Sequence, residues 1–285
     1  MRRAMRLGGI GRIEGLALAT CAIVVGLGLS SCVASGQQSS AASPSAAQVP
    51  ETKTEISPSE RSYLDYAKQE EALRRTDFAN LKRFHQEDAA VPAPVPDEQR
   101  VVFMGDSITQ AWVHNGVPPE APVAGRLYIN RGISGQTTPQ MLLRFRQDVI
   151  ELKPSAVVIF AGINDIAGNT GDMTPEQTED NLASMADLAK VNGIRVVLCS
   201  ITPAFDFPWR PGREPATKVI ALNNWIKSYA ESHGYVYVDF YSAMVDGRGG
   251  LPPALSKDGV HPTPAGYAIM NPLVEAGIAK ALGGM

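Results

Sequence analysis

Short apolar runs alternate with amphipathic stretches from about residue 100 onward. Continuous apolar runs at 101–104, 127–130, 156–161, 194–201 and 235–240 predict strands covered on both faces, because most lack polar alternation. Helix-like stretches lie between and after these runs, near 138–152, 175–191, 215–232 and 264–282. Thr174 and Thr263, each followed by proline, are typical of helix N-caps. The pattern predicts an α/β fold, a three-layer α/β/α sandwich around a parallel sheet.

The first 31 residues have the pattern of an export signal. Four arginines precede an apolar stretch of about 15 residues, which is shorter than the ~20 that a spanning helix needs. The stretch ends in Leu29-Ser30-Ser31-Cys32, which resembles a bacterial lipobox. Residues 1–31 are therefore predicted to be a lipoprotein signal peptide, with Cys32 lipidated and the protein held at a membrane of the bacterial envelope. An ordinary secretory peptide or an uncleaved anchor is the alternative.

Two further segments precede the alternating region. Residues 32–56 are rich in Ser, Ala, Gln and Pro, which predicts a flexible tether. Residues 57–96 are predicted to form a helical extension, either one amphipathic helix or a helical pair, and then a proline-rich connector over 91–96. The apolar positions of the extension are Tyr63, Tyr66, Leu73, Phe78, Leu81 and Phe84. Residues 97–285 are predicted to be a single globular domain.

Composition and charge narrow the classes of partner. Hydrophobic residues make up 44% of the 285 residues, which is enough for a large core. The net charge is -3, and removing the arginine-rich leader leaves a more acidic body with no basic run, which argues against a nucleic-acid partner. Cys199 lies inside an apolar run and is predicted to be a buried free thiol. The sequence makes no prediction of oligomeric state.

Four polar segments at the ends of apolar runs contain the groups that ester hydrolysis needs. Ser107 offers a hydroxyl, His261 a base, and Asp258 a carboxylate three residues before that base. Taken alone, each segment has a structural alternative: Asp106 or Ser107 capping a short helix, and Asp258 forming a turn. The segments are Gly105-Asp106-Ser107, Asn130-Arg131-Gly132, Gly162-Ile163-Asn164-Asp165 and Asp258-Gly259-Val260-His261.

The two middle segments could supply hydrogen-bond donors for an oxyanion. Gly132 offers a backbone N–H with no side chain in the way, and Asn164 offers a neutral amide. Ordinary strand-ending turns are the alternative, and Asp165 is expected to make a structural hydrogen bond. In a flavodoxin-like strand order 2-1-3-4-5, the strands that end at Ser107 and Asn164 are neighbours beside a topological switch point. Independent turns would have no reason to converge there.

These four segments, in this order, resemble the blocks of the SGNH, or GDSL, hydrolase family over roughly residues 100–282. The one departure is Ile108 where the family name has leucine, a volume-conserving change. The resemblance implies the five-stranded flavodoxin-like sheet of order 2-1-3-4-5 and serine esterase activity. It also implies Ser107 as nucleophile, His261 as general base and Asp258 as its orienting acid, with Ser107, Gly132 and Asn164 forming the oxyanion hole.

Substrate preference is encoded less clearly. The loop 205–213 is aromatic and carries two arginines, so Phe207, Trp209 and Arg210, together with Asp106, are candidate substrate-binding residues. A self-packed surface loop is the alternative. No long apolar lid is evident, which favours short acyl groups, above all acetyl groups on a carbohydrate. No cofactor is expected, and no metal, because His-Glu-x-x-His and Cys/His clusters are absent from the sequence.

Other readings of the same residues remain. A lysophospholipase or another acyl ester hydrolase would use the same groups, as would an acyltransferase whose acyl-enzyme is resolved by an alcohol other than water. A lipid-anchored binding module on a hydrolase scaffold, with the helical segment as its partner surface, is the non-enzymatic reading.

Overall fold

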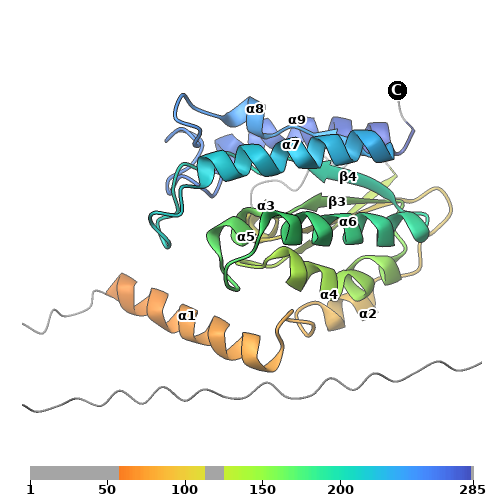
Figure 1. The fold of residues 1–285 in the computed structure, drawn as a ribbon. Helices are drawn as coiled ribbons and strands as arrows, with labels where there is room; N and C mark the ends of the chain where they lie inside the picture. Colours follow the sequence, from red (N-terminus) through yellow and green to blue (C-terminus); the bar gives the residue numbers. More distant parts are fainter. Residues whose placement is uncertain (1–57, 113–124, 284–285) are drawn as a thin grey trace, which may run out of the picture. The chain divides into compact units, whose positions relative to one another are not determined.

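The computed structural model describes residues 58–112 and 125–283, within one compact unit that spans Ile56–Met285. The predicted leader at 1–31, Cys32 and the tether at 32–56 lie outside the described residues. Within the described part, a five-stranded parallel sheet has the order β2-β1-β3-β4-β5. This order confirms the predicted 2-1-3-4-5 arrangement. Figure 1 labels two of its strands, β3 and β4. The strands are β1 (Gln99–Gly105), β2 (Arg126–Gly132), β3 (Ala156–Phe160), β4 (Arg195–Cys199) and β5 (Val236–Val238).

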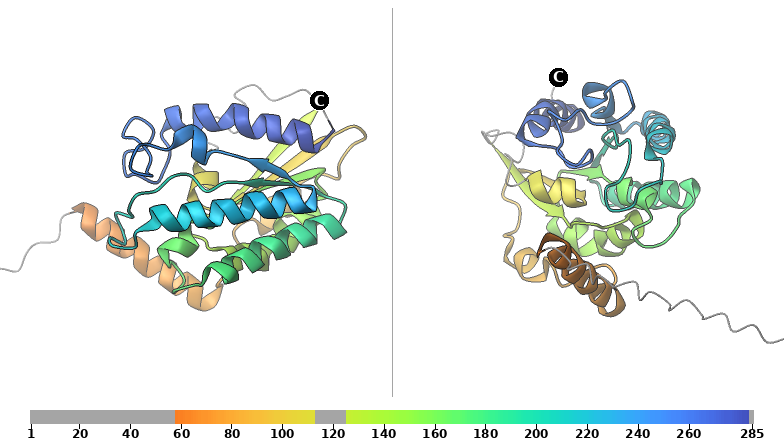
Figure 2. Two further views of the ribbon diagram at one scale, coloured as in Figure 1. Left: turned by 45° about the horizontal axis from the view of Figure 1, so that its top comes forward. Right: turned by 90° about the vertical axis from the view of Figure 1, so that its left-hand side faces the viewer.

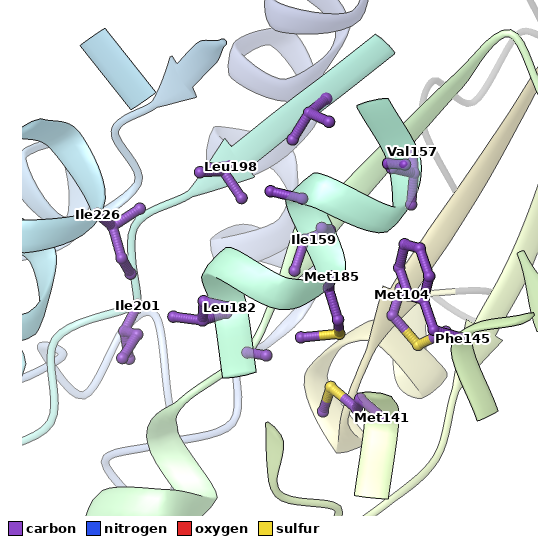
Figure 3. Close-up of a cluster of buried hydrophobic side chains, with 14 of the residues drawn as sticks. Met104, Met141, Phe145, Val157, Ile159, Leu182, Met185, Leu198, Ile201 and Ile226 are labelled. Atoms are coloured by element: carbon purple, nitrogen blue, oxygen red, sulfur yellow. The ribbon is translucent and has the colours of Figure 1, made fainter. Parts of the chain in front are cut away.

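Helices cover both faces of the sheet, as the apolar strands require. One face packs against α4 (Thr138–Asp148), α6 (Pro175–Val191) and α7 (Pro215–His233). Figure 3 shows part of that core, in which Met104 and Ile159 of the sheet meet Met141, Phe145 and Met185 from the helices. The opposite face packs against α3 (Ser107–Trp112) and α9 (Pro264–Ala281). Within the described residues of 99–283 the remaining elements are short: α5 (Ile163–Ala167), the 3₁₀ turn η2 (Ile150–Leu152) and α8 (Tyr241–Met244).

The helix starts show which local predictions succeed. Thr174 caps α6 as predicted, because its hydroxyl accepts the Gln177 N–H while its own N–H donates to the Gln177 side chain. Thr263 also precedes its helix, but its hydroxyl donates to the carbonyl of Ala254 instead of capping α9. The predicted helix over 138–152 ends at Asp148 and is followed by η2.

The helical extension is a pair of helices, α1 (Pro58–Thr76) and α2 (His85–Ala90), and not one continuous helix. The chain between them turns sharply, with Asn80 at a φ of 53°. The Asp77 carboxylate accepts the N–H groups of Leu81 and Lys82 and stabilises that turn. Figures 1 and 2 show α1 running past the end of α5, on one side of the sheet.

Candidate active site

Ser107 is fixed by the turn between β1 and α3. A Cβ on Gly105 would lie 2.0 Å from the Thr109 hydroxyl and 2.7 Å from the Phe160 carbonyl oxygen, so only glycine lets α3 fold back this closely. The buried Asp106 carboxylate accepts the Ile108 N–H at 2.9 Å and holds the first turn of the helix. Ser107 is therefore the first residue of α3, and its N–H has no acceptor within the helix.

Two hydrogen bonds couple α3 to α9. The Tyr267 hydroxyl donates to the Ile108 carbonyl at 2.7 Å, and the Trp112 indole N–H donates to the Asn271 side chain at 2.6 Å. Trp112 is fully buried and makes edge contacts with Phe103, Phe160 and Phe240, a cluster that anchors the far end of α3. Because His261 lies just before α9, this packing sets the separation between its ring and Ser107.

The structure brings Ser107, His261 and Asp258 into one hydrogen-bonded chain. The Ser107 Oγ lies 2.9 Å from His261 Nε2, and His261 Nδ1 lies 2.6 Å from Asp258 Oδ2. The other oxygen of Asp258 accepts three bonds: from the Val260 N–H, the His261 N–H and the Ser256 hydroxyl, at 3.0, 2.8 and 3.0 Å. These bonds fold the loop around its own carboxylate and orient one edge of that carboxylate toward the ring.

The pKa shifts follow from this geometry. Burial alone would raise the pKa of Asp258, but hydrogen bonds from the His261 ring and from the Val260 and His261 N–H groups hold that pKa well below its usual value. The hydrogen bond to Asp258 raises the pKa of His261, against the opposing effect of burial. Asp106 adds a further charge facing the ring, although its own burial raises the pKa of Asp106 to about 7. The site can therefore deprotonate a serine hydroxyl and stabilise the imidazolium that results.

Gly132 is not among the residues that line the cavity at Ser107 and His261. It is the last residue of β2, and its N–H donates to the Asn130 side chain at 2.9 Å. A Cβ there would lie 2.2 Å from the Gln110 backbone nitrogen, so this glycine lets β2 pack against α3. The arrangement is at odds with the predicted oxyanion role of Gly132, because its N–H is already used.

A second glycine, three residues later, lies on the wall of the site together with Asn164. Gly135 has a φ of +74°, and among the described residues its N–H meets no acceptor. Asn164 donates one amide hydrogen to the Gln136 carbonyl at 3.0 Å, which leaves the second for a ligand. Asn169 holds both residues in place, with its side chain donating to the Gly135 carbonyl and to the Asn164 side-chain oxygen. Two glycines in Asn-Arg-Gly-Ile-Ser-Gly were the available sequence signal, but Gly135 and Asn169 were not predicted.

Asp165, beside Asn164, makes the structural bonds expected of it. Its carboxylate accepts the N–H and the hydroxyl of Thr138 and so caps the start of α4. Burial raises the pKa of Asp165 to about 6.

A cavity of about 430 Å³ opens at Ser107 and His261, within the usual range for small-ligand sites. Of the predicted substrate-binding residues, Trp209 and Arg210 line it, and the Trp209 ring lies 5.8 Å from that of His261. Phe207 and Asp106 do not line it. Phe207 is 0% exposed and packs under Trp209, and Asp106 is 2% exposed, so their burial is at odds with the predicted contact with substrate.

The sequence did not predict that the extension would reach the cavity. Glu70, Glu71 and Arg74 of α1 form part of its wall. The charged residues of α1 gave no signal for this, because their position depends on how the helix packs against the rest of the chain.

Two further observations concern metals and membranes. Within 58–112 and 125–283, no group of three or more His, Cys, Asp or Glu side chains is arranged to hold a metal ion. Over the same residues, no helix combines the length and the apolar character needed to cross a bilayer.

Comparison with known proteins places this site in a family. A sequence model of the GDSL-like Lipase/Acylhydrolase family matches residues 103–269. Esterase TesA of Pseudomonas aeruginosa is 34% identical over 180 residues, covering 58% of this chain and 80% of that protein. An acetylxylan esterase of Geobacillus stearothermophilus is 28% identical over 207 residues, covering 60% and 90% of the two chains. The crystal structure of a GDSL-like lipase from Bacteroides thetaiotaomicron superposes with a TM-score of 0.67 at 47% identity, covering 72% of this chain and 100% of that chain. The chain therefore belongs to the GDSL-like lipase/acylhydrolase family and is a serine ester hydrolase.

Proposed function

We propose that this enzyme removes short acyl groups, above all acetyl groups, from carbohydrate esters, with Ser107, His261 and Asp258 as its catalytic residues. The observation that carries the proposal is the unbroken chain of hydrogen bonds from Ser107 through His261 to Asp258 at the wall of an open cavity. Similarity to an acetylxylan esterase supports the choice of ester.

The reaction proceeds through an acyl-enzyme. The Ser107 oxygen attacks the ester carbonyl carbon while its proton passes to His261 Nε2, and Asp258 stabilises the resulting imidazolium. The tetrahedral intermediate collapses, the bond to the alcohol oxygen breaks, and His261 returns the proton to the departing alcohol. Water then attacks the acyl-enzyme, with His261 again taking the proton, and the acid leaves as Ser107 regains its hydrogen.

Three donors surround the position of the developing oxyanion: the Ser107 N–H, the Gly135 N–H and the Asn164 side chain. Ser107 and Gly135 offer N–H groups without protein acceptors among the described residues, and Asn164 has an amide hydrogen to spare. Each donor of this kind typically contributes about 10²–10³ in turnover. Asn169 acts as a positioning residue, because it bonds to both Gly135 and Asn164.

The chemistry of the cavity wall supports a small, polar substrate. Among the described residues that line it, Trp209 is the one large apolar side chain, and none is aliphatic. A long acyl chain would find no aliphatic side chain there to pack against in place of water. A sugar, in contrast, offers hydroxyl groups to the charged residues and a C–H face to the indole ring.

The test is a series of p-nitrophenyl esters from acetate to palmitate, assayed with the full-length protein and with Ser107→Ala. We expect the highest kcat/KM on acetate, and loss of both turnover and phosphonate labelling in the variant. Activity that rises steadily toward palmitate would favour a lysophospholipase or a related acyl ester hydrolase. A wild-type protein without turnover would leave a binding module on a hydrolase scaffold.

We further propose that Cys32 is lipidated and that residues 1–31 are removed as a signal peptide. The proposal rests on Ser30-Ser31-Cys32 after an arginine-rich apolar leader, and these residues lie outside the described part of the chain. Detergent phase partitioning of the protein expressed with its leader should place the wild type in the detergent phase and Cys32→Ser in the aqueous phase. Identical partitioning of the two would contradict lipidation.

A further inference from the structure

The helical extension is held against the hydrolase core by hydrogen bonds from core side chains to its backbone carbonyls. Three core glutamines each donate a side-chain hydrogen bond to a backbone carbonyl of the turn at 78–81, at 2.6–2.8 Å. The pairs are Gln140 with Phe78, Gln136 with Ala79 and Gln147 with Leu81. Gln136 immediately follows Gly135, so one of these contacts joins the extension directly to the loop that carries this proposed oxyanion donor.

A buried ion pair holds the second helix of the extension. The Asp88 carboxylate of α2 accepts hydrogen bonds from Arg131 of β2, at 2.6 and 2.8 Å. The same guanidinium lies 4.6 Å from the centre of the Phe84 ring, which is itself buried. The extension is thus fixed to the core at its turn and again at α2.

From this anchor α1 reaches the cavity at Ser107. Arg74 donates to the Asn169 carbonyl at 2.6 Å, and Asn169 is the residue that positions Gly135 and Asn164. Glu70 lies one helical turn before Arg74 and lines the same cavity. All of α1 lies outside the segment 103–269 that matches the family model.

The two carboxylates of α1 at this wall differ in their partners. Glu71 is paired with Arg75 at 2.5 Å on the exposed face of the helix. Glu70 has neither an ion pair nor a hydrogen bond among the described residues, although it is partly shielded from solvent. A carboxylate in such a position keeps all of its acceptor capacity for a ligand.

We propose that α1 forms the subsite for the alcohol part of the substrate, in which Glu70 accepts hydrogen bonds from sugar hydroxyls while Trp209 stacks on the sugar ring. This inference rests on the proposed function. Glu70 accepts, Arg74 and Arg210 donate, and the indole covers the C–H face, which matches a neutral polyhydroxylated ring. The two carboxylates of this wall are matched by the two guanidinium groups, so no excess of positive charge favours an anionic alcohol, and a lipid alcohol would find no aliphatic wall.

The experiment compares Glu70→Ala with wild type on two acetyl esters. One is a mono-O-acetylated methyl xyloside, which keeps free hydroxyls beside the ester, and the other is p-nitrophenyl acetate, which has none. We expect kcat/KM on the xyloside to fall about tenfold or more, mainly through a higher KM, because hydrogen bonds to a charged group are lost. On p-nitrophenyl acetate the two enzymes should agree within about twofold. Glu87→Ala is the matched control: it removes an exposed glutamate of the same extension that pairs with Arg83 away from the cavity, and it should match wild type on both esters.

The outcomes separate this inference from the proposed function. Equal kcat/KM of Glu70→Ala and wild type on the xyloside would overturn the subsite, as would a matching loss on both esters. A wild-type enzyme that cleaves p-nitrophenyl acetate but not the xyloside would also overturn it while leaving the esterase mechanism intact. Absence of turnover on either ester in the wild type would overturn both the subsite and the proposed function.

Discussion

Replacing Asp258 with asparagine tests how the carboxylate controls the tautomer of His261. In the native site Asp258 Oδ2 lies 2.6 Å from His261 Nδ1, which must carry a hydrogen for this bond to form. An amide nitrogen at that position would donate, so Nδ1 would become the acceptor and Nε2 would carry the hydrogen. Nε2 could then no longer take the Ser107 proton. With the amide turned the other way, its NH₂ group would face the N–H groups of Val260 and His261.

The loss of kcat in Asp258→Asn depends on how exposed His261 and Asp258 are to solvent. In a deeply buried serine triad the same substitution reduces kcat by about 10⁴, or about 5.5 kcal/mol of barrier. Here the side chains of His261 and Asp258 are 41% and 39% exposed, so water can partly solvate the imidazolium. We therefore expect a loss nearer 10³ than 10⁴ in kcat, or about 4 kcal/mol.

The assay is kcat and kcat/KM on p-nitrophenyl acetate from pH 5 to pH 9. Wild-type kcat/KM should rise with pH through a pKa above 6.5, because neutral His261 is the active form and Asp258 favours the charged one. In Asp258→Asn the midpoint should move to lower pH. Ser256→Ala, which removes one of the bonds to the other carboxylate oxygen, should keep the wild-type midpoint. A loss below tenfold with an unmoved midpoint would refute the assigned role of Asp258.

Three further substitutions probe the surroundings of the site. Asn164→Ala should lower kcat by about 10²–10³ while the circular dichroism spectrum is retained, and unchanged kcat would remove Asn164 from the mechanism. Gly132→Ala should lower the free energy of unfolding by about 1–3 kcal/mol, because its Cβ would lie 2.2 Å from the Gln110 nitrogen; an unchanged urea midpoint would contradict this packing. Burial raises the pKa of Asp106 from 3.8 to about 7, so the folded protein binds this proton more tightly than the unfolded chain. That contribution makes wild-type stability fall as pH rises from about 4 to 7. The free energy of unfolding of Asp106→Asn, measured in urea, should therefore increase relative to that of wild type over this range, by up to about 4 kcal/mol. A difference between the two proteins that does not change with pH would contradict the raised pKa of Asp106.

The strands were predictable because burial on both faces leaves a continuous apolar run in the sequence. The run at 156–161 matches β3, Ala156–Phe160, within one residue. The run at 101–104 underestimates β1, which begins at Gln99, because backbone pairing with β2 continues past the apolar residues. The periodicity over 57–90 reflects burial only in part. Phe84 is buried, but Phe78 and Leu81 are exposed, and their place in a turn follows from the Asp77 bonds and the core glutamines.

The site was predictable as a set of groups, whereas the direction in which each group points was not. His261 is one of four histidines in the sequence and follows Asp258 by three residues, so a base with a neighbouring acid could be recognised without the structure. The choice between Gly132 and Gly135 depends on where β2 ends and on whether the Asn130 side chain takes the N–H. The α1 wall depends on contacts between Arg74 and a residue 95 positions away, for which no local pattern exists.

The hydrogen bond between Ser107 and His261 joins residues 154 positions apart, and it forms only when α9 has docked on α3. Esterase activity therefore reports on completion of the longest-range step of folding, not on the appearance of helices or strands. A chain cleaved between the two residues should regain activity only when both fragments reassociate.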